Sequence, residues 1–540
     1  MRISNAMLCY NSHSINPIFS GNHSGMITVL EKPIPFGGGI QLPPNKAISL
    51  EQPLKKAKLP SLVKIPLRQH IGLPALSIVK AGERILKGQI IAKEQGSISA
   101  PIHASTSGYI KEIAEHLIPN PSGAMSPCIV IEADGEDKWV EKKRPIVDFY
   151  SLSPVKIQQK ILEAGVVGLG GAGFPSAVKI IPGFNLDIEL LVLNAAECEP
   201  FISCDETLIR HFAKDVITGI EILAHALQVD ECVIAIEDNK TEAINVLQET
   251  LDSNANIDIK LRLVSSLYPA GGEKQLIKSI TGIEVAAEGL PVDIGVVCYN
   301  VGTAVAVKKA IIDDEPLISR IVTVSGPGVN QACNLEVLLG TPINEVIAQC
   351  GGYSEPYEYL IMGGPMMGFR LYDDDVPVIK TTNCLLAVAA KNNNSKIEES
   401  PCIRCDECAP VCPVKLQPQQ LHWHSKEFNP ERLLDYHLFD CIECGCCSYV
   451  CPSHISLVDE YRQSKNRIWD NRRNQLQAVE NKQRYLNKQN RIEQQKLDKR
   501  NKRLVSAGKN TDNESALKKK QDDIAAAVNR VKAKRKTNNS

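Results

Sequence analysis

Long apolar runs are missing from this chain of 540 residues. A helix that crosses a membrane needs about 20 consecutive, predominantly apolar residues. One candidate, residues 180–193, is interrupted by Pro182 and Asp187, and residues 1–25 lack the apolar centre of a secretory signal peptide. We therefore expect neither a membrane helix nor export, and a chain that stays in a reducing cytoplasm.

Aromatic residues make up only 5% of the sequence, and the formal net charge is −1. This balance hides an asymmetry. Residues 461–540 contain 23 Lys and Arg against 8 Asp and Glu, a net charge of +15, whereas the rest contains 38 against 54, a net charge of −16. The tail has no aromatic cluster on which bases could stack, and the acidic body would repel phosphates. We therefore expect no nucleic acid as a partner, although the basic tail keeps a nucleic-acid-binding protein as an alternative.

The chain contains 18 cysteines, which is many for a protein of the reducing cytoplasm. Half of them lie between positions 402 and 451. In a reducing environment these are metal ligands or buried thiols more often than disulfides. We expect most of the other nine to be small core residues. They are Cys9, Cys128, Cys198, Cys204, Cys232, Cys298, Cys333, Cys350 and Cys384.

The clustered cysteines form two runs with one spacing, C-x2-C-x2-C-x3-C-P. Two-residue gaps let a tight loop present three thiolates to one iron–sulfur cube, while the fourth cysteine points away and can ligate the other cluster. Zinc and disulfides are the alternatives, but a zinc site gives no reason for a duplicated run with trailing prolines. We therefore expect two [4Fe–4S] clusters with crossed ligation. The first set is Cys402, Cys405, Cys408 and Cys451, and the second is Cys441, Cys444, Cys447 and Cys412.

Other metal-binding residue types occur nearby. Cys446 is out of phase with the spacing, so we expect it to be a bystander thiol. His422, His424, His437 and His454 are chemically able to bind iron, but eight cysteines in phase leave them as surface or packing residues.

Composition and pattern divide the chain into six segments. Residues 1–59 are rich in Pro, Gly, Asn and Ser and predict an irregular, loosely structured lead-in. Residues 60–150 alternate short apolar segments with turns, which is typical of a small β barrel or sandwich. Residues 151–316 alternate helical periods with strands at 190–194, 231–237, 257–264 and 294–299, which predicts an α/β unit with a helix starting at Ser153-Pro154.

The remaining segments are shorter. Residues 317–391 predict a small α+β unit, and residues 396–460 hold the cysteine runs, with a helical period at 430–438 between them. Residues 461–540 are expected to form a basic tail that is either a solvated helix or disordered.

A glycine-rich segment is the second informative feature. Gly168, Gly170, Gly171 and Gly173 lie within six residues, so the backbone can approach a ligand closely and consecutive N–H groups can hold an anion. A helical period precedes the segment instead of a strand, which does not fit the dinucleotide fingerprint. The residues alone leave a cofactor site and a structural loop as equal alternatives.

Two later segments favour the cofactor site. Residues 194–200 and 299–303 follow predicted strands, and polar side chains at the carboxyl ends of such strands lie where α/β folds bind ligands. The alternative for Glu197 and Glu199 is a solvated turn.

These motifs together resemble a known family. The segment Gly168-x-Gly170-Gly171-Ala172-Gly173-Phe174-Pro175-x3-Lys179 resembles the FMN- and NADH-binding loop of the flavoprotein subunit of respiratory NADH dehydrogenase. The order of all segments resembles the C subunit of the Rnf (Rsx) ion-translocating electron-transport complex. Residues 35–46 are similar to its N-terminal signature, with Gln41 in place of a histidine. The resemblance covers residues 33–460.

The resemblance implies a fold class, multidomain α/β plus α+β. It comprises a barrel-sandwich domain similar to lipoyl carriers but unmodified, an α/β flavin-binding domain, a β-grasp domain, a helical two-cluster ferredoxin-like domain and the basic tail. It also implies FMN as a cofactor and NAD(H) as a substrate.

Roles of single residues follow from the same resemblance. Glu197 and Lys179 would be catalytic, with Glu197 near the nicotinamide. Gly272 stands where the family has a glutamate, which is a departure in the nicotinamide site. The residues implied in cofactor binding are Gly168, Gly170, Gly171, Gly173, Lys179, Asn194, Glu197, Glu273 and Asn300.

The implied activity is that of a two-electron to one-electron converter, in which flavin and clusters pass electrons between NADH and membrane subunits of the same complex. Ferredoxin or a similar carrier would be a further partner. The expected location is the cytoplasmic face of the bacterial inner membrane, held through partners and the basic tail. A scaffold that only relays electrons, with a vestigial flavin fold, is the alternative.

Overall fold

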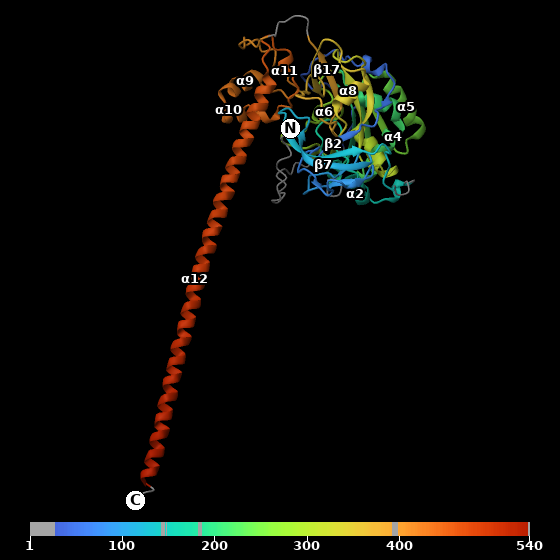
Figure 1. The fold of residues 1–540 in the computed structure, drawn as a ribbon. Helices are drawn as coiled ribbons and strands as arrows, with labels where there is room; N and C mark the ends of the chain where they lie inside the picture. Colours follow the sequence, from blue (N-terminus) through green and yellow to red (C-terminus); the bar gives the residue numbers. More distant parts are fainter. Residues whose placement is uncertain (1–26, 142–145, 147, 182–185, 391–397, 538–540) are drawn as a thin grey trace. The chain divides into compact units, whose positions relative to one another are not determined.

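The computed structural model describes residues 27–141, 146, 148–181, 186–390 and 398–537. Contacts divide the chain into two units, residues 1–462 and residues 463–540 (Figure 1). The second unit consists of the greater part of one helix, α12 (Leu457–Thr537). Among the described residues, no helix is both long and apolar enough to cross a membrane.

Two antiparallel sheets form a small barrel-sandwich near the start of the chain, with strand orders β2-β8-β7-β4 and β3-β5-β6. Side chains alternate along β2, so Val63 and Ile65 point inward and are fully buried. Lys93 ends β5 and does not lie at the tip of the following turn, so an unmodified domain stays the prediction. The strands are β2 (Leu62–Pro66), β3 (Leu76–Ser77), β4 (Arg84–Ile85), β5 (Ile90–Lys93), β6 (Ile102–His103), β7 (Gly108–Leu117) and β8 (Met125–Ala133).

The next part of the first unit is an α/β layer with a fully parallel sheet in the order β11-β10-β9-β12. The Ser153 side chain caps the first helix by accepting from the N–H of Lys156, as the sequence predicts. The strands are β9 (Leu190–Ala195), β10 (Glu231–Glu237), β11 (Ile259–Val264) and β12 (Val296–Asn300). The helices are α2 (Pro154–Glu163), α3 (Ser176–Ile180), α4 (Cys204–Leu227), α5 (Thr241–Asn254), α6 (Glu273–Thr281) and α7 (Val301–Ile312).

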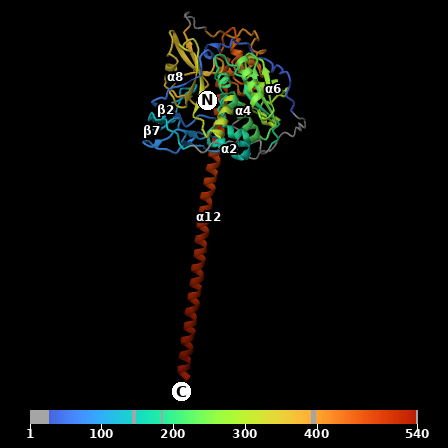
Figure 2. The ribbon, with the colours of Figure 1, turned by 90° about the vertical axis from the view of Figure 1, so that its right-hand side faces the viewer.

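Both faces of this sheet are covered. Leu191 and Leu193 of β9 pack in one buried cluster with α2, α4 and α7, while Leu190 and Val192 pack on the opposite face with α6. Helices α2, α4 and α6 are labelled in Figure 2. Because successive side chains of a strand point to opposite faces, a sheet buried on both sides reads as a continuous apolar run. This explains why residues 190–193 have no polar alternation.

The third part is a six-stranded sheet in the order β1-β14-β13-β17-β15-β16, packed on helix α8 (Ile343–Gln349). Its edge strand β1 (Lys55–Lys56) comes from the N-terminal segment. The other strands are β13 (Ser319–Ser325), β14 (Cys333–Leu338), β15 (Tyr357–Met362), β16 (Phe369–Arg370) and β17 (Cys384–Ala389).

The N-terminal segment is more ordered than its composition indicates. Residues 1–26 lie outside the described part of the chain. From residue 27 onward the segment has few regular elements, among them α1 (Ala47–Leu50), but it is packed: Ile27 and Val29 are buried against α6, and Ile40 pairs with Tyr268. Apolar residues that fill gaps between domains do not recur with the period of a helix or a strand. The sequence pattern therefore does not predict this packing.

The cysteine region is helical. The expected helical period at 430–438 ends at Asp435, because His437 takes a positive φ of 55° and a short 3-10 turn, Leu438–Asp440, follows. This turn leads directly to Cys441. The helices are α9 (Pro418–Glu427), α10 (Pro430–Asp435) and α11 (Cys446–Tyr449).

Lys380 joins three parts of the first unit. It follows the six-stranded sheet's β16, and its Nζ donates to the carbonyl oxygens of Pro101 in the barrel, at 3.0 Å, and Gly165 in the α/β layer, at 2.7 Å. Burial lowers the pKa of Lys380 to about 7. A neutral amine keeps two N–H groups, which matches the two acceptors.

We expect Lys380→Met to change how stability depends on pH. The amine is protonated up to about pH 10 in the unfolded chain but only up to about 7 in the fold. Between these values the unfolded state binds more protons, so wild-type stability rises with pH, by up to ~1.4 kcal/mol per pH unit. The wild-type melting temperature should therefore increase relative to that of the variant from pH 7 to pH 9. An equal difference at both values would mean that Lys380 stays charged in the fold.

Candidate functional site

The glycine-rich loop, residues 166–174, connects α2 to α3 and packs on the junction of β12 and α7. The N–H of Leu169 donates to Thr303 Oγ1 at 3.0 Å, and the N–H of Gly168 donates to the carbonyl of Phe174 at 2.7 Å. A Cβ built on Gly170 would lie 3.3 Å from the Cβ of Asn300. The structure thus brings the loop and Asn300 together.

The loop has the features of an anion cradle. Gly171 has a φ of +124°, which disfavours other residues, and a Cβ built on it would meet no atom within 4 Å, so the space above it is open. Within the described part of the chain, no hydrogen-bond acceptor is found for the N–H groups of Gly170, Gly171 and Ala172. Free N–H groups beside open space fit a phosphate group.

Lys179 and Glu273, both implied in nucleotide binding, form one pair. Lys179 Nζ donates to Glu273 Oε1 and to the carbonyl of Cys298, both at 2.9 Å, and lies 5.6 Å from the ring centroid of Tyr299. Burial alone would lower the pKa of Lys179, but the adjacent carboxylate outweighs this effect and raises it. The ammonium therefore stays charged.

Asn194 lies at the end of β9 and holds a neighbouring segment. Its Nδ2 donates to the carbonyl of Gly271 at 2.9 Å, and its Oδ1 accepts from the N–H of Ala196. Three residues before Gly271, the buried hydroxyl of Tyr268 donates to the carbonyl of Cys444 at 2.7 Å. One continuous segment thus connects the end of the sheet to the second cysteine run.

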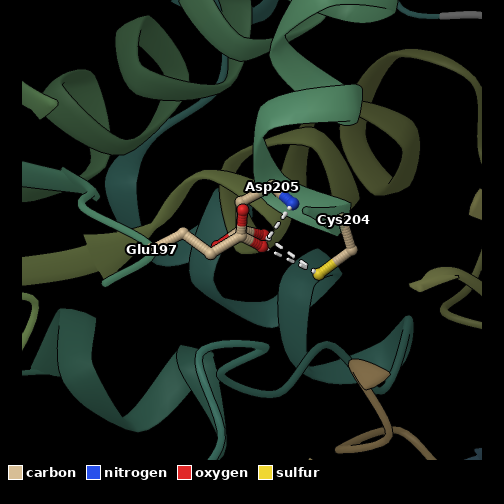
Figure 3. Close-up of side chains that lie close together, drawn as sticks. All are labelled: Glu197, Cys204 and Asp205. Atoms are coloured by element: carbon tan, nitrogen blue, oxygen red, sulfur yellow. Dashed lines mark hydrogen bonds between the residues drawn. The ribbon is translucent and has the colours of Figure 1, made fainter. Parts of the chain in front are cut away.

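The side chain of Glu197 is buried and not solvated. Its carboxylate is buried and faces the start of α4, where Oε1 accepts from the N–H of Asp205 at 2.9 Å and lies 3.3 Å from Cys204 Sγ (Figure 3). The alternative of a solvated turn requires an open carboxylate, whereas a position near the nicotinamide stays a prediction. The side chain is only 5% exposed.

Two ammonium groups neutralise this carboxylate. Lys46 Nζ and Lys240 Nζ lie 3.8 Å and 3.7 Å from Glu197 Oε2. Burial would raise the pKa of Glu197, but the two cations outweigh this effect and lower it. Glu197, Cys204 and Asp205 offer potential ligand atoms within 4.8 Å of one another. Lys240 also lies 3.1 Å from Glu237 Oε2, so its charge is shared between two buried carboxylates.

The eight in-phase cysteines surround two separate cavities. The first, of about 400 Å³, is lined by Cys402, Cys405, Cys408 and Cys451. The second, of about 20 Å³, is lined by Cys412, Cys441, Cys444 and Cys447. Each cavity thus has three thiols from one run and the last thiol of the other run, and four thiols are the donor set that a [4Fe–4S] cluster takes. Crossed ligation itself stays a prediction.

Cys446 and one of the four histidines, His422, also line these cavities. Cys446 is fully buried and also lines the second cavity. His422 lines the first cavity, and its Nδ1 lies 2.6 Å from Glu460 Oε2. Its expected packing role stays a prediction.

Sequence reasoning missed three charged residues of the site. Asp205 carries a signal, because acidic residues are common in the first turn of a helix. Lys240 and Arg320 carry none, since their roles depend on contacts between distant segments. Arg320 Nη2 donates to the carbonyl of Leu169 in the glycine-rich loop at 3.4 Å.

Four family models match the chain. They are the RnfC barrel sandwich hybrid domain over residues 34–136, the Nuo51 FMN-binding domain over 161–309, the SLBB domain over 321–370 and the 4Fe-4S dicluster domain over 397–455. With the structure, they confirm the expected mixed fold class of barrel-sandwich, flavin-binding, β-grasp and ferredoxin-like domains. They also confirm the expected FMN and iron–sulfur cofactors.

Curated relatives are similar over most of the chain. The C subunit of an ion-translocating oxidoreductase complex of Pseudomonas aeruginosa is 44% identical over 85% of this chain, which spans 58% of that protein's length. The equivalent C subunit of Haemophilus influenzae is 43% identical, over 93% of this chain and 74% of that protein. A solved NAD+-reducing [NiFe]-hydrogenase is 20% identical, with a TM-score of 0.39 and coverage of 54% of each chain.

Crossed ligation predicts the effect of Cys451→Ser. The change should disturb the cluster of the first run, because Cys451 lines the cavity of Cys402, Cys405 and Cys408. A spectroscopic probe placed near Cys405 would detect the change, as would electron paramagnetic resonance of the reduced protein. Cys446→Ser is the matched control and should leave iron content unchanged. A signal change confined to the cluster of Cys441 would show that each run closes its own cube.

Proposed function

The chain belongs to the family formed by the C subunits of ion-translocating oxidoreductase complexes, and from this premise we propose that it passes electrons between a nicotinamide nucleotide and other subunits of a membrane-bound complex. One observation carries the proposal. A single segment, from the buried Tyr268 to Gly271, contacts both Asn194 of the flavin-binding layer and Cys444 of the dicluster region. The two redox sites are therefore adjacent parts of one unit.

We assign the flavin phosphate to the glycine-rich loop. The N–H groups of Gly170 and Gly171 hold it, with Gly168 and Gly173 shaping the turn and Asn300 alongside. Lys179, kept charged by Glu273, attracts the anionic nucleotide. FMN, when bound, supplies a centre that takes up a hydride and gives up electrons singly. Asn194 fixes Gly271 and the segment implied in nicotinamide binding.

We assign one [4Fe–4S] cluster to each cysteine cavity, with the crossed ligand sets. Tyr268 donates to the carbonyl of Cys444, which lines the cavity of Cys412, Cys441, Cys444 and Cys447, so the cluster of this cavity is the inner one. Cys405 of the other cavity is exposed, so the outer cluster lies at the surface.

The proposal includes the electron-transfer partners of the chain and its location in the cell. Other subunits of the complex accept or deliver the electrons, and ferredoxin or a similar carrier exchanges them. The chain works peripherally on the cytoplasmic face of the bacterial inner membrane. Either direction of electron flow uses the same residues.

The function is tested by anaerobic purification and addition of NADH, with flavin and cluster absorbance followed together. Both should bleach in the wild type. Gly171→Val, which places a β-branched side chain in the open space, should lose flavin and NADH reactivity but keep both clusters. Gly82→Val is the matched control, because Gly82 also has a positive φ, +84°, and open space around it. A flavin-free wild type with intact clusters would favour the relaying scaffold.

The basic tail predicts an electrostatic attachment to the membrane surface, in addition to attachment through partner subunits. Described side chains of residues 470–534 are exposed, including the basic residues, and each basic group near an anionic surface contributes roughly 1 kcal/mol. Truncation at Asn466 should therefore weaken membrane association in low salt and leave NADH oxidation intact. Equal membrane recovery of both proteins in low and high salt would refute this role.

A further inference from the structure

Asn300 is held from two sides. As N-cap of α7, its Oδ1 accepts from the N–H of Gly302 at 2.8 Å. Its Nδ2 donates to Asp205 Oδ2 at 2.6 Å. With both amide atoms engaged, the side chain has one orientation, and its Cβ faces Gly170 of the glycine-rich loop.

Asp205 is fixed in turn by Glu197. At the start of α4, the N–H of Asp205 donates to Glu197 Oε1 at 2.9 Å (Figure 3). The N–H of Glu206 donates to the other carboxylate oxygen, Oε2, at 3.5 Å. A carboxylate at a helix N-terminus is favourable, because it accepts from N–H groups that have no partner within the helix. Glu197 thus sets the position of the first turn of α4, from which Asp205 reaches Asn300.

The charge of Asp205 is less well compensated than that of Glu197. Lys46 and Lys240 lie 3.8 Å and 3.7 Å from Glu197 Oε2, and Lys240 also lies 3.1 Å from Glu237 Oε2. Burial and the charge of Glu197 raise the pKa of Asp205 to about 6, so its ionised form is disfavoured. Lys240 and Arg320 face it and oppose this effect, as does the bond to Asn300. A buried carboxylate whose charge is disfavoured by its surroundings, and which is hydrogen-bonded to an amide, is typical of a functional site.

We propose that Asp205 is a positioning residue of the flavin site, which acts through Asn300 and is itself held by Glu197. The inference rests on the proposed function and deepens it. It also gives the buried Glu197 carboxylate a role in the site, because this group orders the start of α4.

A double-mutant cycle tests the proposal. The full-length chain, purified anaerobically with its clusters, is titrated with FMN and the dissociation constant is read from flavin fluorescence. Asp205→Ala should weaken FMN binding roughly tenfold or more, because a hydrogen bond to a charged group is lost. Asp205→Asn should recover most of the affinity, since its amide oxygen still accepts from Asn300 Nδ2. In the Asn300→Ala background, Asp205→Ala should cause no further loss.

Glu221→Gln is the matched control. Glu221 is buried on the same helix and accepts from the N–H and Nδ2 of Asn256, at 2.7 Å and 3.1 Å, with no link to Asn300. The control should bind FMN as the wild type does. If Asp205→Ala does not fold, Asp205→Ser replaces it, because serine is tolerated in a first helical turn but is too short to reach the amide.

The outcomes distinguish failure of the proposed function from failure of the positioning role of Asp205. A wild type that binds no FMN overturns the proposed function before any variant is compared. If the wild type binds FMN but Asp205→Ala binds it within about twofold, or if the losses from Asp205→Ala and Asn300→Ala multiply, Asp205 does not act through Asn300. In those cases only the positioning role is refuted.

Discussion

A glycine-rich loop has to be held from outside, because glycine has more backbone freedom to lose than any other residue. Here three parts of the first unit each contribute a contact. Thr303 of α7 accepts from the N–H of Leu169, Arg320 of the six-stranded sheet donates to its carbonyl, and Ile71 of the barrel donates to the carbonyl of Gly173. The shape of the loop, and with it the candidate flavin site, therefore depends on the assembly of all three domains.

Buried charge imposes a second requirement on that assembly. A carboxylate out of water is costly unless cations and hydrogen bonds compensate it. Glu197 receives Lys240, which directly precedes α5, and Lys46 from the N-terminal segment. The Lys46 ammonium also donates to the carbonyl of Glu197. Through Lys46, the N-terminal segment is therefore a component of the site.

Local patterns could be read from the sequence, and contacts between distant segments could not. The bounds of β10, Glu231–Glu237, and the cap at Ser153 were predictable, because apolar runs and capping residues act within a few positions. The spacing of the cysteines likewise indicated clusters, which the family models support. The burial of Glu197 was not predictable, because it depends on Lys46 and Lys240, which lie 151 and 43 positions away in the sequence.

The same distinction applies to the two cysteine runs, whose spacing is identical but whose surroundings differ. Cys444 and Cys447 are buried, and the carbonyl of Cys444 accepts from the hydroxyl of Tyr268, whereas Cys405 is exposed. Solvent exposure and hydrogen bonds near the sulfur ligands tune the reduction potential of an iron–sulfur cluster. Two clusters held by chemically equal motifs would therefore have unequal potentials. The fold around the motifs, and not the motifs themselves, would distinguish an inner electron carrier from an outer one.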